Sequence, residues 1–282
     1  MNWSNESVAV IGCGVMAQCL VDGWLKNKIF QESKMILTDS YPAGLEALKK
    51  KYQACHISSD NSDAVLKSSI VFICVKPFMV ESVLSAIPQS NFAGKIVISV
   101  AAGLKLSLYH GILKGSGVRA IYRVMPNIAC RVESGLTAIC GQSAVDGIYC
   151  DNELMNSTKA IFEPLGGWTA VEDEKLMDVV TALNGSALAF GCMAIEAMAD
   201  GAVAMGLPRA MALSLSAHAL KAASALHLGT GEHPAVLRDQ ITTPGGCTIA
   251  GLLALEEGNF RSTLAKAVQE TTRVSKQLGE KK

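Results

Sequence analysis

Five short apolar runs, each rich in valine and isoleucine, divide the first half of the chain at regular intervals. Segments long enough for a helix separate one run from the next. Continuous apolar runs of this length are typical of parallel strands that are buried on both faces, so the alternation predicts a doubly wound α/β sheet. The runs are VAVIG (8–12), MILTD (35–39), IVFICV (70–75), KIVISV (95–100) and RAIYRV (119–124). Two later segments, GLTAIC and GGWTAV, are candidates for further strands at one edge.

A glycine-rich turn follows the first run and opens a predicted helix. Its residues are Gly12, Cys13, Gly14, Val15, Met16 and Ala17. The first glycine permits a sharp turn, the second lets a pyrophosphate approach the backbone, and the small Ala17 lets helix and strand pack closely. The anion would lie at the helix N-terminus, where free N–H groups and the helix dipole favour it. This context favours a Rossmann-type dinucleotide site over a purely structural strand–turn–helix unit.

Three further strand ends are candidates for the same site, because ligands of open α/β sheets lie beyond the carboxyl ends of the strands. Asp39 ends the second strand, 22 residues after Ala17. A carboxylate there can accept both ribose hydroxyls of NAD and would repel a 2′-phosphate, which favours NADH over NADPH. The alternative is that Asp39 only caps the turn DSYPAG.

The other two strand ends supply the remaining predicted cofactor residues, which are Val75, Lys76 and Pro77, and Ala101, Ala102 and Gly103. Lys76 is followed by a proline that fixes the turn, so we expect it to position the nicotinamide-side ribose rather than to act in catalysis. A solvated lysine at a strand end is the alternative.

The pattern of the chain changes near Asp173. The segments that follow are rich in Ala, Leu and Met and repeat apolar residues at spacings of three and four, which predicts a bundle of helices. We therefore predict a dinucleotide-binding domain over residues 1–172 and an all-helical domain over residues 173–282. The longest uncharged stretch, residues 179–195, contains several polar or glycine positions and is expected to be a buried helix rather than a membrane span.

Composition excludes several classes of protein. The 25 basic and 25 acidic side chains cancel, so no broad positive field is available for nucleic acid. The nine cysteines form no Cys-x-x-Cys pair and the five histidines do not cluster with them, which predicts reduced thiols and no metal site. The N-terminal residues resemble neither a signal peptide nor an arginine-rich transit peptide, since the first arginine is Arg119. A cytoplasmic protein without membrane attachment is expected.

The helical half lacks groups for demanding proton transfer. Dehydrogenases that act on 3-hydroxy acids need a strong proton carrier, usually a lysine early in the helical domain. No lysine occurs between Lys175 and Lys221, and Glu196 and Asp200 are spaced like side chains on a solvated or interhelical face. A C=N substrate fits this site, because an imine can be protonated before or during reduction and its carbon then accepts hydride readily.

The segment TTPGGCT (242–248) precedes another apolar helix. Backbone N–H groups of Gly246, Cys247 and Thr248 at a positive helix end would form a small socket for a carboxylate. The Thr248 hydroxyl can donate and accept, so it could hydrogen-bond a ring nitrogen beside that socket. An ordinary helix cap is the alternative.

Together these segments resemble the pyrroline-5-carboxylate reductases, the last enzymes of proline biosynthesis. The resemblance covers essentially the whole chain and rests on IGCGVMA, FICVKP, SVAAG, RVMPN, ADGAVAMGLPR and above all HPAVLRDQITTPGGCTIAGL. It implies NAD(P)H-dependent reduction of 1-pyrroline-5-carboxylate to L-proline. It also implies a homodimer with interlocked helical domains that build each active site from two subunits, often assembled further into decamers.

The resemblance also assigns roles to residues. It implies that the backbone at the Pro-Gly-Gly motif holds the substrate carboxylate, that Thr248 is catalytic and touches the pyrroline nitrogen, and that the RVMPN segment lines the pocket near the nicotinamide. The substrate-binding residues that it implies are Gly245, Gly246, Cys247, Thr248, Met125 and Asn127, with Pro126 between the last two.

Two departures from the family pattern fall near the expected pocket. The family usually has Ser-Gly-Ser-Gly-Pro-Ala-Tyr where this chain has NGSALAF, which starts at Asn184. It has Thr-Pro after RVMPN where this chain has Ile128 and Ala129. These changes keep two alternatives open: a related cyclic imino acid as substrate, and an inactive dinucleotide-binding paralogue. A 3-hydroxy-acid-type dehydrogenase is a further alternative, which the missing lysine disfavours.

Overall fold

The computed structural model describes residues 3–141 and 152–280 of the chain. Two compact units are present: Met1–Gly185 together with Thr271–Lys282, and Ser186–Glu270. The C-terminal residues therefore belong to the same unit as the N-terminal half. The domain boundary expected at residue 172 from the change of sequence pattern stays a prediction.

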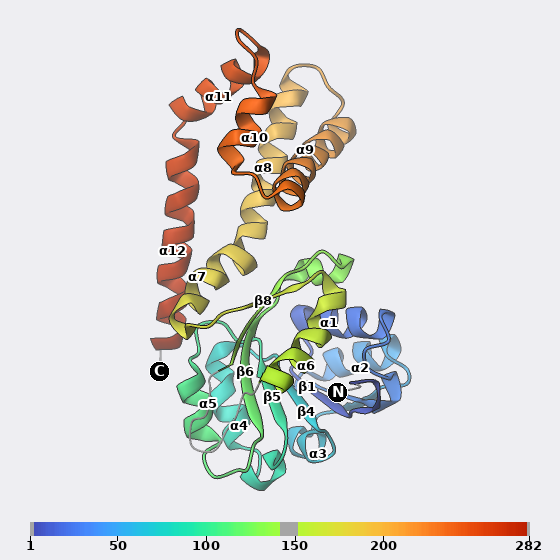
Figure 1. Ribbon diagram of the computed structural model, residues 1–282. Coiled ribbons are helices and arrows are strands. Elements are labelled where there is room, and N and C mark those ends of the chain that lie inside the picture. Colours follow the sequence, from blue (N-terminus) through green and yellow to red (C-terminus); the bar gives the residue numbers. More distant parts are fainter. Residues whose placement is uncertain (1–2, 142–151, 281–282) are drawn as a thin grey trace. The chain divides into compact units, whose positions relative to one another are not determined.

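An eight-stranded sheet forms the middle of the first unit (Figure 1), in the order β3-β2-β1-β4-β5-β6-β7-β8. Strands β1 to β6 are parallel, β7 is antiparallel to β6, and β8 is parallel to β7. The strands are β1 (Val8–Ile11), β2 (Met35–Thr38), β3 (His56–Ser58), β4 (Ile70–Ile73), β5 (Ile96–Ser99), β6 (Ala120–Met125), β7 (Thr137–Gly141) and β8 (Trp168–Ala170).

The predicted doubly wound sheet is confirmed. The five apolar runs are β1, β2, β4, β5 and β6, and the two later segments are β7 and β8 at one edge, as expected. Strand β3 was not predicted from the sequence. It has only three residues and lies at the other edge of the sheet with its side chains partly exposed, so it lacks an apolar run.

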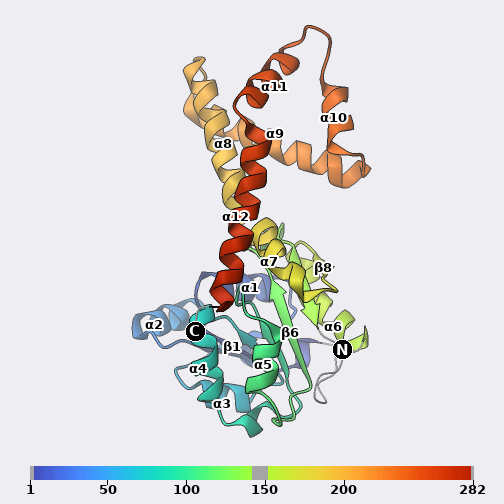
Figure 2. The same cartoon turned by 90° about the vertical axis from the view of Figure 1, so that its left-hand side faces the viewer.

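Successive side chains of each strand enter two different hydrophobic cores, because the side chains of a strand alternate between the two faces of the sheet. In β1, Val8 and Val10 belong to one core, and Ala9 and Ile11 belong to the other. Each core is covered by its own helices, as the two views of the ribbon show (Figure 2). The sheet therefore buries both faces, which is why its central strands are continuously apolar.

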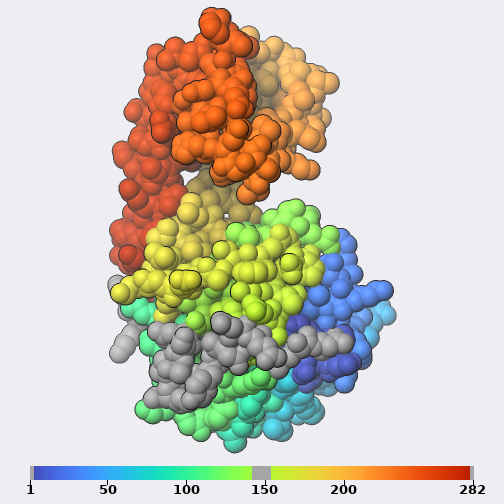
Figure 3. Space-filling model, viewed as in Figure 1, coloured from blue at the N-terminus to red at the C-terminus, as the bar shows by residue number. Residues whose placement is uncertain are grey.

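The first core is covered by α1 (Val15–Lys26), α2 (Pro42–Lys51) and α6 (Asn152–Phe162). The second is covered by α3 (Asn61–Leu66), α4 (Val80–Ser85), α5 (Leu106–Ile112) and α7 (Met177–Val180). In the space-filling view, α6 and the segment that leads to β8 form much of the visible surface of this unit (Figure 3).

The second unit is helical. It contains α8 (Ala187–Ala204), α9 (Arg209–Thr230), α10 (Pro234–Ile241), α11 (Cys247–Glu257) and the first half of α12 (Phe260–Glu280). Few of its described side chains are buried, among them Ala199, Ala212 and Leu237. Large apolar side chains are exposed instead, including Met193, Met205, Met211, Leu215, Leu228 and Leu253. Exposed apolar side chains in this number are typical of protein–protein or membrane interaction sites.

The stretch Glu174–Ala204 is long and apolar enough to cross a membrane by length and composition, with a mean hydropathy of 1.5 over an 18-residue window of which 6% is buried. Helices covered by other protein chains can have the same length and composition. The expectation of a buried helix over residues 179–195 is wrong for most of the stretch in the single chain, because only Thr181 and Ala182 are buried and the other residues are half-buried or exposed. The reason is that the second unit is too small and too open to enclose α8, so burial of this helix needs a covering surface.

Candidate cofactor and substrate site

The predicted cofactor residues share one edge of the sheet. Strands β2, β1, β4, β5 and β6 are consecutive neighbours and all parallel, so their carboxyl ends lie along the same edge. Gly12 follows β1, Asp39 follows β2, Val75 and its neighbours follow β4, and Ala101 follows β5. The tertiary structure thus brings together four segments that are far apart in sequence, at the place where open α/β sheets bind ligands.

The glycine turn has the geometry that its sequence predicts. Gly12 has φ of +86°, and a Cβ added to it would lie 2.6 Å from Val75 Cγ1, so a larger residue there is excluded by both backbone and space. Gly14 is the N-cap of α1 and provides no side-chain cap, and a Cβ on it would meet nothing within 4 Å. Open space therefore faces an uncapped helix N-terminus, as an approaching pyrophosphate requires. Ala17 is 1% exposed and packs α1 against the sheet.

The other residues of the turn contribute in different ways. Cys13 is buried, and burial raises the pKa of its thiol far above the usual range, so the side chain is a small neutral core group. The Val15 side chain is 68% exposed and Met16 packs against the first core. At Cys13 the backbone rather than the thiol is therefore suited to meet a ligand. Among the described residues no group of three or more His, Cys, Asp or Glu side chains could hold a metal ion.

Asp39 connects the glycine turn to the turn after β2. Its Oδ2 accepts a hydrogen bond from the Cys13 N–H at 3.0 Å, and its Oδ1 accepts one from the Tyr41 N–H at 3.0 Å. The second bond is the turn cap considered as the alternative role. The first bond holds the carboxylate against the predicted dinucleotide turn, where a negative charge disfavours a second anion. The geometry is thus compatible both with Asp39 as a turn cap and with Asp39 as a residue that disfavours a 2′-phosphate.

Sequence reasoning missed a polar pair beside Asp39. Thr38 Oγ1 donates to Asn61 Oδ1 at 2.6 Å, which joins the end of β2 to the start of α3. Asn61 follows the short strand β3, and its position after an unpredicted strand is why it was missed. A scan for polar residues that follow each strand end would have found it.

Two buried hydroxyl groups, those of Ser99 and Tyr109, stabilise the start of the Ala101–Gly103 turn. Ser99 Oγ accepts from the Ala101 N–H at 3.2 Å and shares a 2.6 Å hydrogen bond with Tyr109 Oη. Lys76 is exposed and caps the short 3₁₀ turn Pro77–Met79, whose Met79 N–H donates to the Lys76 carbonyl at 2.9 Å. The two turns after β4 and β5 are thus fixed by their own local hydrogen bonds.

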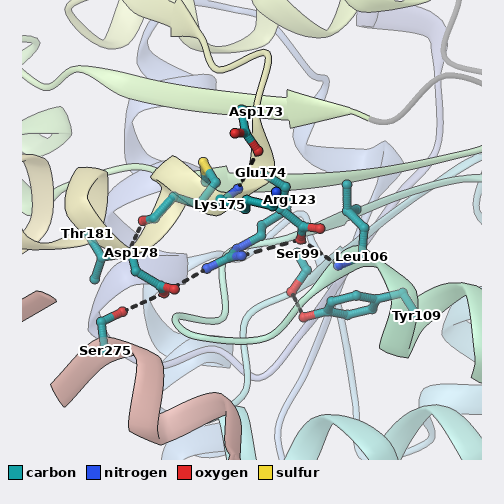
Figure 4. Close-up of polar contacts among 11 residues, drawn as sticks. Ser99, Leu106, Tyr109, Arg123, Asp173, Glu174, Lys175, Asp178, Thr181 and Ser275 are labelled. Carbon is teal, nitrogen blue, oxygen red and sulfur yellow. Dashed lines mark hydrogen bonds and ion pairs between the residues drawn. The ribbon is translucent and has the colours of Figure 1, made fainter. Parts of the chain in front are cut away.

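A buried ion-pair network lies next to the Ser99 and Tyr109 pair (Figure 4). The Arg123 side chain is 1% exposed and its two terminal nitrogens pair with Glu174 Oε1 and Asp178 Oδ1, each at 3.3 Å. Glu174 Oε1 also accepts from the Leu106 N–H at 2.6 Å, at the start of α5. The charge of Arg123 is therefore matched by carboxylates that are themselves hydrogen-bonded, as a buried ion pair requires.

The end of α12 packs directly on the Gly103 turn. Gly103 has φ of +78°, and a Cβ added to it would lie 2.7 Å from the Ser275 carbonyl oxygen. A Cβ on Gly279 would overlap the Gly103 carbonyl. Two glycines thus let two backbones approach closely, and this approach places the C-terminal helix against a predicted cofactor turn.

The turn after β6 is bound to the π-helical segment Thr181–Ser186. Asn127 is 6% exposed; its Oδ1 accepts from the Ala129 N–H at 3.1 Å, and its Nδ2 donates to Asn184 Oδ1 at 3.0 Å. The oxygen and the nitrogen of the Asn127 amide therefore both hydrogen-bond to groups of the same chain. Asn184 was noticed in the sequence only as a departure from the family pattern, and the structure brings it to Met125 and Asn127.

The Pro-Gly-Gly loop lies in the second unit, between α10 and α11. Gly245 has φ of +68°, and the Gly246 N–H closes a tight turn onto the Thr243 carbonyl at 3.0 Å. Gly246 therefore does not offer its N–H to a ligand. It is the N-cap of α11 and provides no side-chain cap, which leaves the N–H groups of Cys247 and Thr248 in the first turn of that helix. The Thr248 side chain lines a hollow of about 440 Å³ between α9, α10 and α11.

Comparisons with known proteins give a consistent result. A family model described as pyrroline-5-carboxylate reductase dimerisation matches residues 174–278, and one described as NADP oxidoreductase coenzyme F420-dependent matches residues 7–103. A pyrroline-5-carboxylate reductase of Methanosarcina acetivorans is 39% identical over 98% of this chain and 99% of its own length. One of Synechocystis is 36% identical over 97% of this chain and 98% of its own.

A solved structure shows the same fold at nearly full length. The Plasmodium falciparum pyrroline carboxylate reductase with NADP bound has a TM-score of 0.86 at 26% identity, and the alignment covers 98% of this chain and 99% of that chain. The similarity thus extends over both compact units rather than over the dinucleotide-binding half alone.

Proposed function

This chain belongs to the pyrroline-5-carboxylate reductase family, and we propose that it reduces 1-pyrroline-5-carboxylate to L-proline with NAD(P)H. The observation that supports this most directly is that relatives of that name match both the Gly-rich sheet edge and the Pro-Gly-Gly loop, in one chain of the same length. The absence of a lysine between Lys175 and Lys221 also favours an imine over a 3-hydroxy acid as substrate.

NAD(P)H fits the edge formed by the parallel strands. The uncapped start of α1 and the open space over Gly14 suit the pyrophosphate, and the turns at Val75–Pro77 and Ala101–Gly103 would flank the nicotinamide half. When bound there, the cofactor supplies a hydride. Lys76 would position the ribose on the nicotinamide side and would not touch the reacting atoms.

We propose a preference for NADH. Two backbone N–H groups hold the Asp39 carboxylate at the turn, so it cannot swing away from a 2′-phosphate without losing both hydrogen bonds. A phosphate carries at least one full charge, and the resulting repulsion opposes NADPH. The Plasmodium relative was solved with NADP bound, so this preference would distinguish the chain from that relative.

The Pro-Gly-Gly loop would bind the substrate carboxylate. The N–H groups of Cys247 and Thr248 at the start of α11 suit a carboxylate through hydrogen bonds and the helix dipole. The Thr248 hydroxyl could then hydrogen-bond the ring nitrogen and help to hold the proton that the product amine retains. Hydride would arrive at the adjacent carbon, which the C=N bond leaves electron-poor.

We also propose a homodimer with interlocked helical units, assembled further into a decamer, in the cytoplasm. The exposed apolar side chains of α8, α9 and α11 supply a surface that a second copy can bury. This covering explains the apolar stretch Glu174–Ala204 without a membrane. Light scattering coupled to gel filtration would measure the mass of the assembly.

The decisive experiment follows the absorbance of NADH and of NADPH in the presence of 1-pyrroline-5-carboxylate and identifies proline as the product by mass spectrometry. Oxidation that depends on the substrate is expected, faster with NADH. Oxidation with another cyclic imino acid only would identify a related reductase. Cofactor binding without oxidation of either nucleotide would identify an inactive paralogue and would contradict the proposed activity.

A further inference from the structure

The side chain of Asn184 joins three segments of the first unit. Its Nδ2 donates to the Met125 carbonyl at 2.6 Å and to the Leu136 carbonyl at 2.7 Å, and its Oδ1 accepts from Asn127 Nδ2 at 3.0 Å. Two carbonyl oxygens can be met only by a donor, so this orientation of the amide follows from its neighbours. Asn184 thereby ties the end of β6 to the segment that precedes β7.

The backbone around Asn184 is itself unusual. Residues Thr181–Ser186 form a π-helical turn between α7 and α8. Such turns are rare insertions within α-helices and are frequent at functional sites. Gly185 continues the contact with β6, because a Cβ on it would lie 3.7 Å from Met125 Sδ. The π-helical turn thus faces Met125 through both its asparagine and its glycine.

Both ends of the Asn127 amide are occupied within this network. Asn184 takes its donor side, and the Ala129 N–H takes its acceptor side at 3.1 Å. These two partners are among the positions at which the chain departs from the family pattern. A proline at position 129 has no N–H to donate, and a serine at position 184 has one hydroxyl hydrogen and cannot donate to two carbonyls. The two departures therefore act on a single side chain.

We propose that Asn184 is a positioning residue for the reaction, which acts through the Met125–Asn127 turn. It holds the Met125–Asn127 turn at the carboxyl end of β6 in one conformation, with the Asn127 amide turned inward. This inference rests on the proposed function and on the expectation from the family resemblance that this turn lines the pocket near the nicotinamide. The turn then recognises its substrate by shape and backbone, and the Asn127 side chain makes no direct contact with it.

The test compares Asn184→Ser with the unchanged chain. A loosened turn should raise KM for 1-pyrroline-5-carboxylate about tenfold, since small misplacements of a binding element reduce catalysis steeply. The dissociation constant for NADH, measured by nucleotide fluorescence, should change less than about twofold, because the pyrophosphate turn is on other strands. Asn91→Ser is the matched control: it removes an amide that donates to the Ser62 carbonyl at 3.1 Å, and it should leave KM unchanged.

A double-mutant cycle tests whether Asn184 and Asn127 hold the same turn. In an Asn127→Ala background, Asn184→Ser should raise KM by a smaller factor than in the unchanged chain, because one of the three hydrogen bonds of Asn184 is already gone. Ala129→Pro removes the hydrogen bond on the other side of the same amide and should also raise KM, so it serves if Asn184→Ser does not fold. Unchanged KM in a folded variant, or an undiminished effect in the Asn127→Ala background, would overturn the inference. Absence of turnover in the unchanged chain would instead overturn the proposed function, and this inference with it.

Discussion

Arg123 Nη2 lies 3.3 Å from Asp178 Oδ1, and the same carboxylate oxygen accepts a hydrogen bond from Ser275 Oγ at 2.9 Å. One oxygen atom thus joins a central strand, α7 and the end of the C-terminal helix (Figure 4). Arg123 and Ser275 are almost fully buried. The pairing matters for the site because the same end of α12 packs on the Gly103 turn.

Replacing Arg123 by methionine should destabilise the chain by about 3 kcal/mol, because two carboxylates would be left without their buried cation. Urea unfolding at fixed protein concentration measures this change. Arg209→Met is the matched control, since its ion pair with Asp200 is exposed and should contribute less than about 1 kcal/mol. Equal losses in the two variants would show that the Arg123 network contributes no more than a surface pair.

Replacing Asp39 by serine should shift the cofactor preference toward NADPH. Removal of the charge should raise the ratio of kcat/KM for NADPH to that for NADH about tenfold, which corresponds to about 1.4 kcal/mol of repulsion. Steady-state kinetics with both nucleotides measure the ratio. Asp173→Ser is the control, because Asp173 also accepts a backbone hydrogen bond, from Lys175 at 3.0 Å. An unchanged ratio would remove Asp39 from the cofactor site.

Replacing Thr248 by alanine should lower kcat while cofactor binding stays the same. Loss of a hydroxyl that helps to hold a proton should reduce kcat by a factor of about 100, with the dissociation constant for NADH unchanged. The control is Thr242→Ala in the same loop, whose hydroxyl donates to the Arg238 carbonyl at 2.7 Å. Full activity in Thr248→Ala would mean that the hydroxyl has no part in the chemistry, although the backbone socket could still bind the carboxylate.

Bound L-proline should protect Cys247 from alkylation. Cys247 begins α11 and its thiol is exposed in the chain, as is that of Cys192 in α8. A carboxylate at the α11 N-terminus would cover the first and not the second. Iodoacetamide labelling followed by peptide mass spectrometry, with and without proline and NAD⁺, compares the two sites. Protection that is equal at both cysteines would argue against a carboxylate socket in the Pro-Gly-Gly loop.

Stability should fall in strong alkali partly through Tyr109. Burial raises the pKa of Tyr109 to about 12, and the Ser99 hydrogen bond lowers it by less. Because the folded state keeps its proton longer than the unfolded state, the free energy of unfolding decreases between about pH 10 and pH 12. Tyr109→Phe should flatten this decrease in unfolding curves measured across that range. Tyr41→Phe, at an exposed tyrosine, is the control, and a similar flattening in both would contradict the assignment.

Much of the cofactor edge could be predicted from sequence because its determinants are local. Gly12 has a positive φ, as a tight turn requires. Gly14 and Ala17 follow it at the start of α1, within the first turn of the helix. The five apolar runs identified β1, β2, β4, β5 and β6, and two later segments identified β7 and β8. Strand β3 is too short and too exposed to show a pattern. The Pro-Gly-Gly turn was recognised in the same way, although the Gly246 N–H proved to close the turn.

Only the tertiary structure decided which distant side chains meet. Asn184 reaches Met125 across 59 residues of sequence, and Ser275 reaches Asp178 across 97. A local pattern reports spacing along a strand or helix, whereas these contacts depend on the order of the strands in the sheet and on where the last helix ends. The sequence alone therefore determined the elements and the residues at their ends. The packing of those elements determined that the Asn127 amide is turned inward and that α12 closes on the Gly103 turn, because a buried polar group without a partner is costly.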